Sequence, residues 1–194
     1  MTKTLTGGAP VALCNAADSL LIVVDIQQRL GDAMPGKVLN RVLQNTILLA
    51  RSATLLGVPV IQTEQYPRGL GTTHPSVAAA LPQDTRAIEK LSFSCCAADG
   101  FLDAVAQTQR RQAVLVGMEA HVCVLQTALG LAGTGLDVFV VEDATCSRRL
   151  ENYQNALDRL RQSGVTVVSA ESTVFEWLAS ASHEHFKAIQ ALLR

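Results

Sequence analysis

The sequence contains two kinds of segment, which differ in how their apolar and polar residues are arranged. Short runs that are almost wholly apolar, such as residues 20–24 and 113–116, are typical of strands buried on both faces of a sheet. Longer segments between them repeat apolar residues every three or four positions, which is the spacing of a helix with one buried face. The two kinds take turns along most of the chain, so the pattern predicts an α/β protein.

The pattern also places the individual elements. Six strands are predicted, at residues 20–25, 58–63, 87–89, 113–116, 137–142 and 165–169. Helices are predicted at residues 38–56, 99–109, 122–132, 147–163 (capped at Ser147 or in the following turn), 172–178 and 183–193. Residues 65–82, with three prolines and two glycines, are predicted as loop, with a helical turn at residues 76–81. The fold class expected is a three-layer, doubly wound, mostly parallel six-stranded sheet with helices on both faces.

Length and composition fit one domain. The chain has 194 residues, of which we expect 1–18 to be a loose N-terminal leader and 19–194 a single domain. A net charge of −1 gives no reason to expect nucleic-acid binding, and no apolar run is long enough to span a membrane. The first residues lack the order of a signal peptide, so we expect a cytoplasmic protein that acts on a small molecule.

The five cysteines form an odd set without a C-x-x-C pair: Cys14, Cys95, Cys96, Cys123 and Cys146. Free thiols in a reducing compartment are therefore expected, and zinc ligation by them is not. Cys95 and Cys96 are interpreted as wall or core residues.

Cys123 lies where a predicted strand turns into a predicted helix. Free backbone N–H groups and the positive end of a helix favour a thiolate there, so we expect a lowered thiol pKa. The same N–H groups could hold a developing oxyanion. The competing interpretation is a buried structural cysteine, because cysteine is among the most buried residue types.

Two charged residues lie at the ends of other predicted strands. Asp25 ends the first and Lys90 follows the third, and the carboxyl ends of parallel strands meet at one edge of a sheet. Asp25 could take the thiol proton, while Lys90 could orient Asp25 and add positive charge. Taken singly, Asp25 could instead cap the following turn, and Lys90 could be a surface charge.

The motifs around these three residues resemble those of a known family. Gly-Met-Glu-Ala-His-Val-Cys-Val at residues 117–124, with Asp25 and Lys90 in the same order, is similar to the isochorismatase-like cysteine hydrolases, which include nicotinamidases and N-carbamoyl amidohydrolases. The likeness runs from about residue 19 to 176, and Thr-Glu-Gln-Tyr-Pro at residues 63–67 resembles the isochorismatase domain-containing proteins. The resemblance implies Asp25, Lys90 and Cys123 as a catalytic triad with Asp25 as the base.

The resemblance also implies an oxyanion hole made of the backbone N–H groups of Glu119 and Cys123, with a cis peptide bond between Met118 and Glu119. His121 is a rival base because a histidine titrates near neutrality, although a separation of two residues in a turn usually aims side chains apart. Otherwise it is a pocket or structural residue. Gln27, Tyr66, Phe93 and Glu119 are candidates for the pocket wall, with ordinary core packing as the alternative.

Nicotinamidases in the family bind a divalent ion in the loop after the second strand. The corresponding loop here, residues 64–74, offers His74 and no aspartate, so we expect neither a metal nor a cofactor. The resulting hypothesis is a metal-independent cysteine hydrolase of a small amide, ureido or related C–N substrate, through an acyl-cysteine intermediate.

Two alternatives stay open. One is a vinyl-ether hydrolase of the isochorismatase type, which needs no covalent nucleophile. The other is a non-catalytic homologue that binds a metabolite or acts as a scaffold. Apolar residues near the end of the chain, among them Phe175, Phe186 and Leu193, also predict a homo-oligomer with active sites near subunit boundaries.

Overall fold

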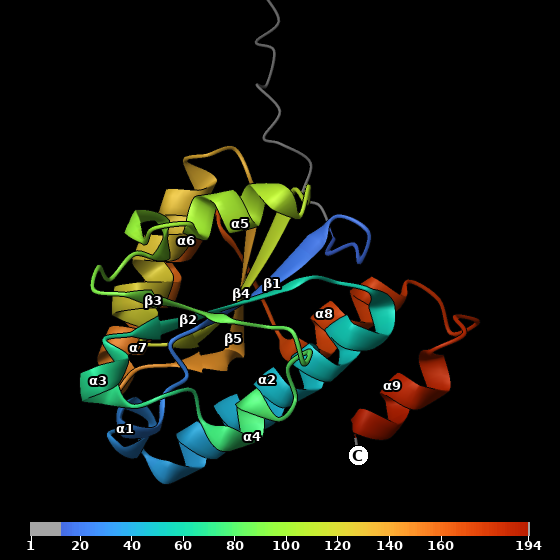
Figure 1. Cartoon of the computed structure of the whole chain (residues 1–194). Coiled ribbons are helices and arrows are strands. Elements are labelled where there is room, and N and C mark those ends of the chain that lie inside the picture. Colours follow the sequence, from blue (N-terminus) through green and yellow to red (C-terminus); the bar gives the residue numbers. More distant parts are fainter. Residues whose placement is uncertain (1–12, 194) are drawn as a thin grey trace, which may run out of the picture.

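The computed structural model describes residues 13–193, and within them one parallel sheet forms the central layer (Figure 1). Its strands are β1 Ser19–Val24, β2 Val60–Gln65, β3 Ala87–Lys90, β4 Gln112–Met118, β5 Asp137–Cys146 and β6 Thr166–Val168. The strand order is β3-β2-β1-β4-β5-β6, and every pairing between these strands is parallel. The predicted fold class is confirmed, with a sheet that is wholly parallel over the described residues.

The chain crosses the sheet in two directions from its centre. From β1 it moves outward through β2 to β3, and it then returns to place β4 on the other side of β1. Every side chain of β1 and β4 is buried, which explains why their sequences are apolar without alternation. At such a reversal of strand order, the loops at the carboxyl ends diverge and leave room for a ligand.

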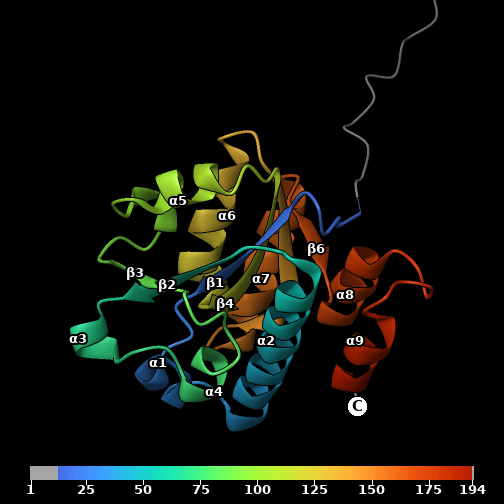
Figure 2. The ribbon, with the colours of Figure 1, turned by 45° about the vertical axis from the view of Figure 1, so that its right-hand side comes forward.

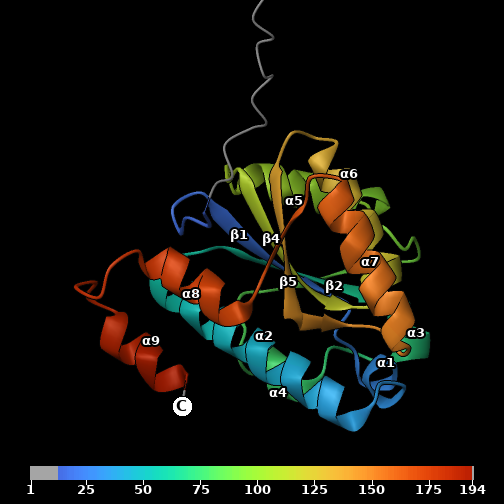
Figure 3. The same cartoon turned by 180° about the vertical axis from the view of Figure 1, so that it is seen from behind.

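Helices cover both faces of the sheet. They are α1 Gln28–Asp32, α2 Gly36–Leu56, α3 Pro67–Leu70, α4 Pro75–Ala78, α5 Phe101–Gln107, α6 Leu125–Ala132, α7 Leu150–Gln162, α8 Ala170–Leu178 and α9 Phe186–Leu192. Figures 2 and 3 show α2, α8 and α9 on one side of the sheet and α5, α6 and α7 on the other. The strands divide their side chains accordingly, because Leu21 and Val23 join the core under α2 and α8, while Leu20 and Ile22 join the core under α5 to α7.

Some boundaries differ from the sequence prediction. Strand β5 continues past residue 142 to Cys146, because its register with β4 shifts between Leu115 and Gly117 and pairing resumes beyond the shift. The predicted helix at 122–132 begins earlier, with a single π turn η2 at Ala120–Val124 before α6. The cap predicted near Ser147 is wrong, since α7 starts after Arg149 without a side-chain cap.

Some residues before β1 also contact the domain. Residues 13–18 pack on the domain: Cys14 is buried, and its N–H donates to Oε2 of Glu176 at 2.7 Å. Gln112 Nε2 donates to the carbonyl of Leu13 at 3.0 Å. The packed region therefore begins before Ser19, while residues 1–12 of the predicted leader lie outside the described residues. No helix found between residues 13 and 193 combines the length and the apolar character needed to cross a membrane.

Candidate active site

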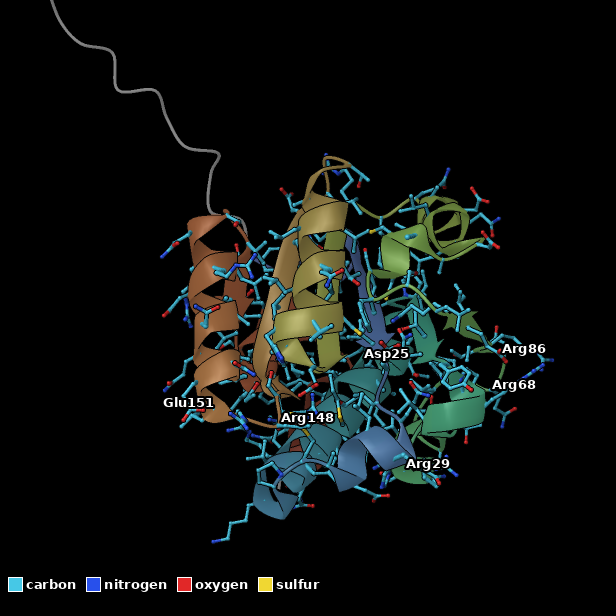
Figure 4. All side chains as sticks on the ribbon, turned by 90° about the vertical axis from the view of Figure 1, so that its left-hand side faces the viewer. Asp25, Arg29, Arg68, Arg86, Arg148 and Glu151 are labelled. Carbon is cyan, nitrogen blue, oxygen red and sulfur yellow. The ribbon has the colours of Figure 1, made fainter. Side chains whose placement is uncertain are left out.

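The three residues selected from the sequence lie at one edge of the sheet. Asp25 directly follows β1, Lys90 ends β3, and Cys123 lies in the π turn after β4. Asp25 has φ of 50°, a left-handed conformation that turns the chain sharply out of β1. Figure 4 looks onto this edge, with Asp25 near the middle between Arg148 on one side and Arg68 on the other.

Asp25 and Lys90 form a buried ion pair. Lys90 Nζ lies 2.6 Å from Asp25 Oδ2, and both side chains are 0% exposed. The ammonium also donates to Gln65 Oε1 at 2.8 Å and to the carbonyls of Ser92 and Phe93, each at 3.2 Å. These acceptors replace the water that the charge loses on burial. Lys90 is therefore not a surface charge.

The second oxygen of Asp25 has its own partner. Thr63, fully buried near the end of β2, donates its hydroxyl to Asp25 Oδ1 at 2.8 Å. The parallel register pairs Val24 with Thr63, which brings this hydroxyl beside the residue that follows β1. The carboxylate thus accepts one hydrogen bond on each oxygen, from β2 and from β3.

The thiol of Cys123 is buried next to this pair. Its residue is 5% exposed, and burial raises the pKa of the thiol from 9.0 to about 12, with the negative charge of Asp25 adding to the rise and the Lys90 ammonium opposing it. The expectation of a lowered pKa is therefore wrong, because desolvation outweighs the positive charge nearby. The resting site holds a neutral thiol close to a carboxylate.

A sharp turn carries the chain from β4 into the π turn. Gly117 has φ of 131°, and a Cβ at this position would collide with the backbone carbonyl of Val24. The Met118–Glu119 peptide bond is cis. The buried carboxylate of Glu119 accepts hydrogen bonds from the backbone N–H of Arg148 at 2.9 Å and from its Nε at 3.1 Å. The side chain of Glu119 is thus tied to the segment before α7.

The pocket candidates have different surroundings. Gln27 is fully buried, and its side-chain amide forms hydrogen bonds with the backbone of Gln65 and Gly71, so it fastens the loop after β2. Tyr66 is 50% exposed and Phe93 55% exposed. A cavity of about 530 Å³ is lined by Tyr66, Lys90 and neighbouring residues, whereas Phe93 and Cys123 are not part of its lining.

His121 is held by other side chains. Its Nδ1 lies 2.9 Å from Ser147 Oγ, and its Nε2 lies 3.3 Å from Asn152 Nδ2. Both ring nitrogens are thus engaged between the end of β5 and α7. This geometry gives no support to His121 as the base for Cys123, and favours the structural interpretation.

No cluster of three or more His, Cys, Asp or Glu side chains suited to a metal ion occurs within residues 13–193. His74, the histidine of the loop after β2, instead contacts Ser76 Oγ through Nδ1 at 2.8 Å. All five cysteines are free thiols.

The sequence prediction missed several residues at this edge. Thr63 and Gln65 belong to the stretch at residues 63–67 that resembles the isochorismatase domain-containing proteins, but the sequence predicts no role in the site for either. Cys95, interpreted as wall or core, is fully buried with its Sγ 3.6 Å from Thr63 Oγ1. The register of β1 and β2 is the signal that would have found Thr63, because it aligns that residue with the one before Asp25.

Comparison with known proteins agrees with this architecture. The family model described as the isochorismatase domain matches residues 19–172. Isochorismatase domain-containing protein 2 of Bos taurus is 37% identical over 177 residues, which cover 91% of this chain and 83% of that protein. Isochorismatase domain-containing protein 1 of Danio rerio is 34% identical, and the match spans 92% of this chain but 62% of that longer protein.

Solved structures give the same result. A structure described as the MAR1 ribonuclease from Caenorhabditis elegans is 34% identical with a TM-score of 0.88, covering 94% of this chain and 92% of that one. The YcaC gene product from Escherichia coli, described as an octameric hydrolase of unknown specificity, is 25% identical with a TM-score of 0.82, covering 96% and 97%. From the match of the family model, these relatives and the shared fold, this chain belongs to the isochorismatase-like hydrolase family.

Proposed function

We propose that this protein is a metal-independent cysteine hydrolase of a small amide, ureido or related C–N substrate, acting through an acyl-cysteine intermediate. The observation that carries the proposal is the fully buried Asp25–Lys90 pair, joined at 2.6 Å, beside the thiol of Cys123. A charged pair in the interior costs free energy unless every partner is in place, so it is rarely kept without a role.

The first step is attack by sulfur. Because its pKa is raised to about 12, the Cys123 thiol keeps its proton in the resting enzyme, and Asp25 accepts that proton as the C–S bond forms. The electron pair of the C=O double bond moves onto oxygen. The N–H groups of Glu119 and Cys123 are the donors proposed for this oxyanion.

The remaining steps release the two products. The tetrahedral intermediate collapses, the C–N bond breaks, and Asp25 returns the proton to the leaving nitrogen. Water then attacks the acyl-cysteine while Asp25 accepts its proton, and that proton returns to sulfur as the C–S bond breaks. Throughout, Lys90 holds Asp25 by its ion pair and keeps a positive charge near the reacting atoms.

A small substrate suits the surroundings of the site. The cavity of about 530 Å³ at Tyr66 and Lys90 is within the size range of small-molecule pockets. Asp25 and Cys123 are not among its lining residues, so we propose that a substrate bound there extends from it toward the thiol. Tyr66 and Phe93 offer flat apolar surfaces near it, and we propose that they contact a small planar acyl group. The free thiols of the five cysteines fit a reducing compartment, which supports a cytoplasmic location.

The test is a panel of amides and ureido compounds, followed by ammonia release and by the mass of the Cys123 peptide. We expect ammonia from at least one compound, with a mass increase equal to its acyl group during turnover. Cys123→Ala should abolish both signals, and Asp25→Asn should lower turnover at least about 100-fold. Turnover by Cys123→Ala equal to that of the native protein would refute the covalent route.

A ribonucleic acid substrate belongs in the same panel, because one similar structure carries the name ribonuclease. The net charge of −1 gives this chain no general attraction for a phosphate backbone. We therefore expect no cleavage of a labelled single-stranded RNA. If the native protein cleaves the RNA and Cys123→Ala does not, the substrate is a nucleic acid and not a C–N compound.

A further inference from the structure

A short chain of hydrogen-bonding groups leads from Cys95 to Asp25. Thr63 Oγ1 lies 2.8 Å from Asp25 Oδ1 and 3.6 Å from Cys95 Sγ. All three side chains are fully buried. The chain approaches Asp25 from β2, on the carboxylate oxygen that Lys90 does not occupy.

We propose that Thr63 is a positioning residue for the base Asp25, and that Cys95 donates to the Thr63 hydroxyl oxygen and holds it in place. This inference rests on the proposed function, because it gives Thr63 a role only if Asp25 accepts the proton of Cys123. Neither Thr63 nor Cys95 contacts the reacting atoms in this scheme.

Chemistry fixes the direction of the hydrogen bonds. A carboxylate only accepts, so the single proton of Thr63 Oγ1 must point to Asp25 Oδ1. The lone pairs of that oxygen are then free to accept from Cys95. Burial raises the pKa of Cys95 to about 11, and the nearby charge of Asp25 adds to this rise, so the thiol keeps the proton that it donates.

Two donors on opposite oxygens restrict the rotation of the Asp25 carboxylate. Lys90 alone, bound to Oδ2, leaves the carboxylate free to turn about its last side-chain bond, where rotation has no deep wells. The hydrogen bond from the Thr63 hydroxyl to Oδ1 fixes the plane of the carboxylate. Each oxygen keeps a further lone pair, and one of these can receive the proton of Cys123.

Cys95 is itself fixed relative to the nucleophile. Its backbone N–H donates at 2.9 Å to Oγ1 of Thr127, a buried residue on α6. Thr127 follows Cys123 by four positions, which is one helical turn. The turn that carries Cys95 is thus attached to the same helix that positions Cys123, so the donor, the hydroxyl and the base keep their alignment.

The experiment measures the rate at which iodoacetamide alkylates Cys123, followed by mass spectrometry of the Cys123 peptide at one fixed, mildly alkaline pH. This probe needs no knowledge of the substrate. Thr63→Val keeps the shape of the side chain but removes the hydroxyl, and we expect the rate to fall about tenfold or more. Thr63→Ser restores the donor, and its rate should lie within about threefold of that of the native protein.

The matched control is Thr46→Val on α2. Thr46 is also a fully buried threonine, but its hydroxyl has no hydrogen-bond partner among the described residues. Its loss should leave the alkylation rate unchanged. A Thr63→Val protein that unfolds would be recognised by its circular dichroism, and the test then rests on Thr63→Ser together with Cys95→Ala.

Cys95→Ala tests the second part of the inference. It should slow alkylation less than Thr63→Val does, and the double variant should match Thr63→Val, because both changes act through one hydroxyl. If the double variant instead slows alkylation by the product of the two single effects, Cys95 does not act through Thr63.

Asp25→Asn separates failure of the inference from failure of the proposed function. If Asp25→Asn alkylates as fast as the native protein, Asp25 is not the base, and both ideas fail. If Asp25→Asn is slow while Thr63→Val keeps the native rate, only the role of Thr63 is overturned.

Discussion

The ion pair of Asp25 and Lys90 is stable in the interior only because both charges are fully satisfied. The carboxylate accepts from Lys90 and Thr63, and the ammonium donates to Asp25, Gln65 and two backbone carbonyls. Removing one partner would leave the other charge buried without compensation. The free-energy cost of such an isolated charge is much larger than the net contribution of the intact pair.

Lys90→Met is therefore expected to lower the free energy of unfolding by roughly 3–5 kcal/mol. The double variant Asp25→Asn with Lys90→Met should recover part of that loss, since it removes both charges. Urea denaturation followed by circular dichroism measures each value. The control is Lys37→Met on the exposed surface of α2, which should change stability by less than about 0.5 kcal/mol. A loss for Lys90→Met as small as that of the control would contradict the burial of the pair.

Because some thiols are buried, the free energy of unfolding depends on pH in the alkaline range. Burial raises the pKa of Cys146 from 9.0 to about 12, and the charge of Glu119 adds to the rise. Well below pH 9.0 the thiol is protonated in both the folded and the unfolded protein, so its burial causes no loss of stability there. Between the two values only the unfolded thiol loses its proton, which favours unfolding by up to about 1.4 kcal/mol per pH unit.

We expect Cys146→Ala to flatten the fall of unfolding free energy over this alkaline range, whatever its effect on stability at neutral pH. Urea denaturation at several pH values between 9.0 and about 12 gives the slope. Cys96→Ala is the comparison, because its half-buried thiol should change the slope less. Equal slopes for the native protein and Cys146→Ala would show that this thiol titrates normally.

Among the elements, the turn after β4 determines where the nucleophile lies. Gly117 pairs with Val24 on β1 and with Thr145 on β5, so it sits at the carboxyl end of the two central strands. Its left-handed φ and its contact with the carbonyl of Val24 exclude a side chain. The close approach of β4 to β1 at this point brings the π turn with Cys123 next to Asp25.

Gly117→Ala should lower the free energy of unfolding by at least about 3 kcal/mol, since backbone strain and a collision add together. Gly36→Ala, at the start of α2, is the matched control: a Cβ there meets no atom within 4 Å, and φ is not left-handed. It should change stability by less than about 1 kcal/mol. Thermal or urea unfolding of both variants decides, and equal stabilities would refute the steric argument.

On the scale of the whole molecule, large apolar side chains are exposed beside the candidate site. Leu91 is 76% exposed, Phe93 55% and Tyr66 50%. They lie near the end of β3 and in the loop after β2, next to Lys90. Apolar side chains gathered at one place are typical of an interface, and one similar structure is an octamer. From these observations we propose that a second copy of this chain covers this edge, which would be one form of the homo-oligomer expected from the sequence.

Light scattering should therefore give a mass that is a multiple of the 20.7 kDa of one chain. Leu91→Glu places a charge in the proposed interface and should shift the protein toward the monomer mass. Leu102→Glu on α5, where the leucine is 40% exposed, is the control and should keep the native mass. A native mass equal to that of one chain would refute the predicted oligomer. Dissociation by Leu102→Glu but not by Leu91→Glu would show that the interface lies on another face of the protein.

The fold could be predicted from the sequence because its physical signals are local. Apolar runs and helical spacing identified all six strands and both helix layers, since burial on two faces or on one face leaves a direct pattern in the chain. Short elements were less predictable. Helix α1 was missed, and the π turn was interpreted as ordinary helix, because one turn is too short for a periodic pattern.

The candidate site could also be predicted from the sequence only in part. That Asp25, Lys90 and Cys123 follow strands was readable from the chain, and parallel strands bring such positions to one edge. Only the tertiary structure decided what surrounds them, because burial and strand register are set by segments distant in sequence. Thr63 and Cys95, some 40 and 70 residues after Asp25, reach it through the pairing of β1 with β2 and the packing of the turn after β3 on α6. For the same reason the local argument about a helix terminus gave the wrong direction for the Cys123 pKa: desolvation depends on the whole fold.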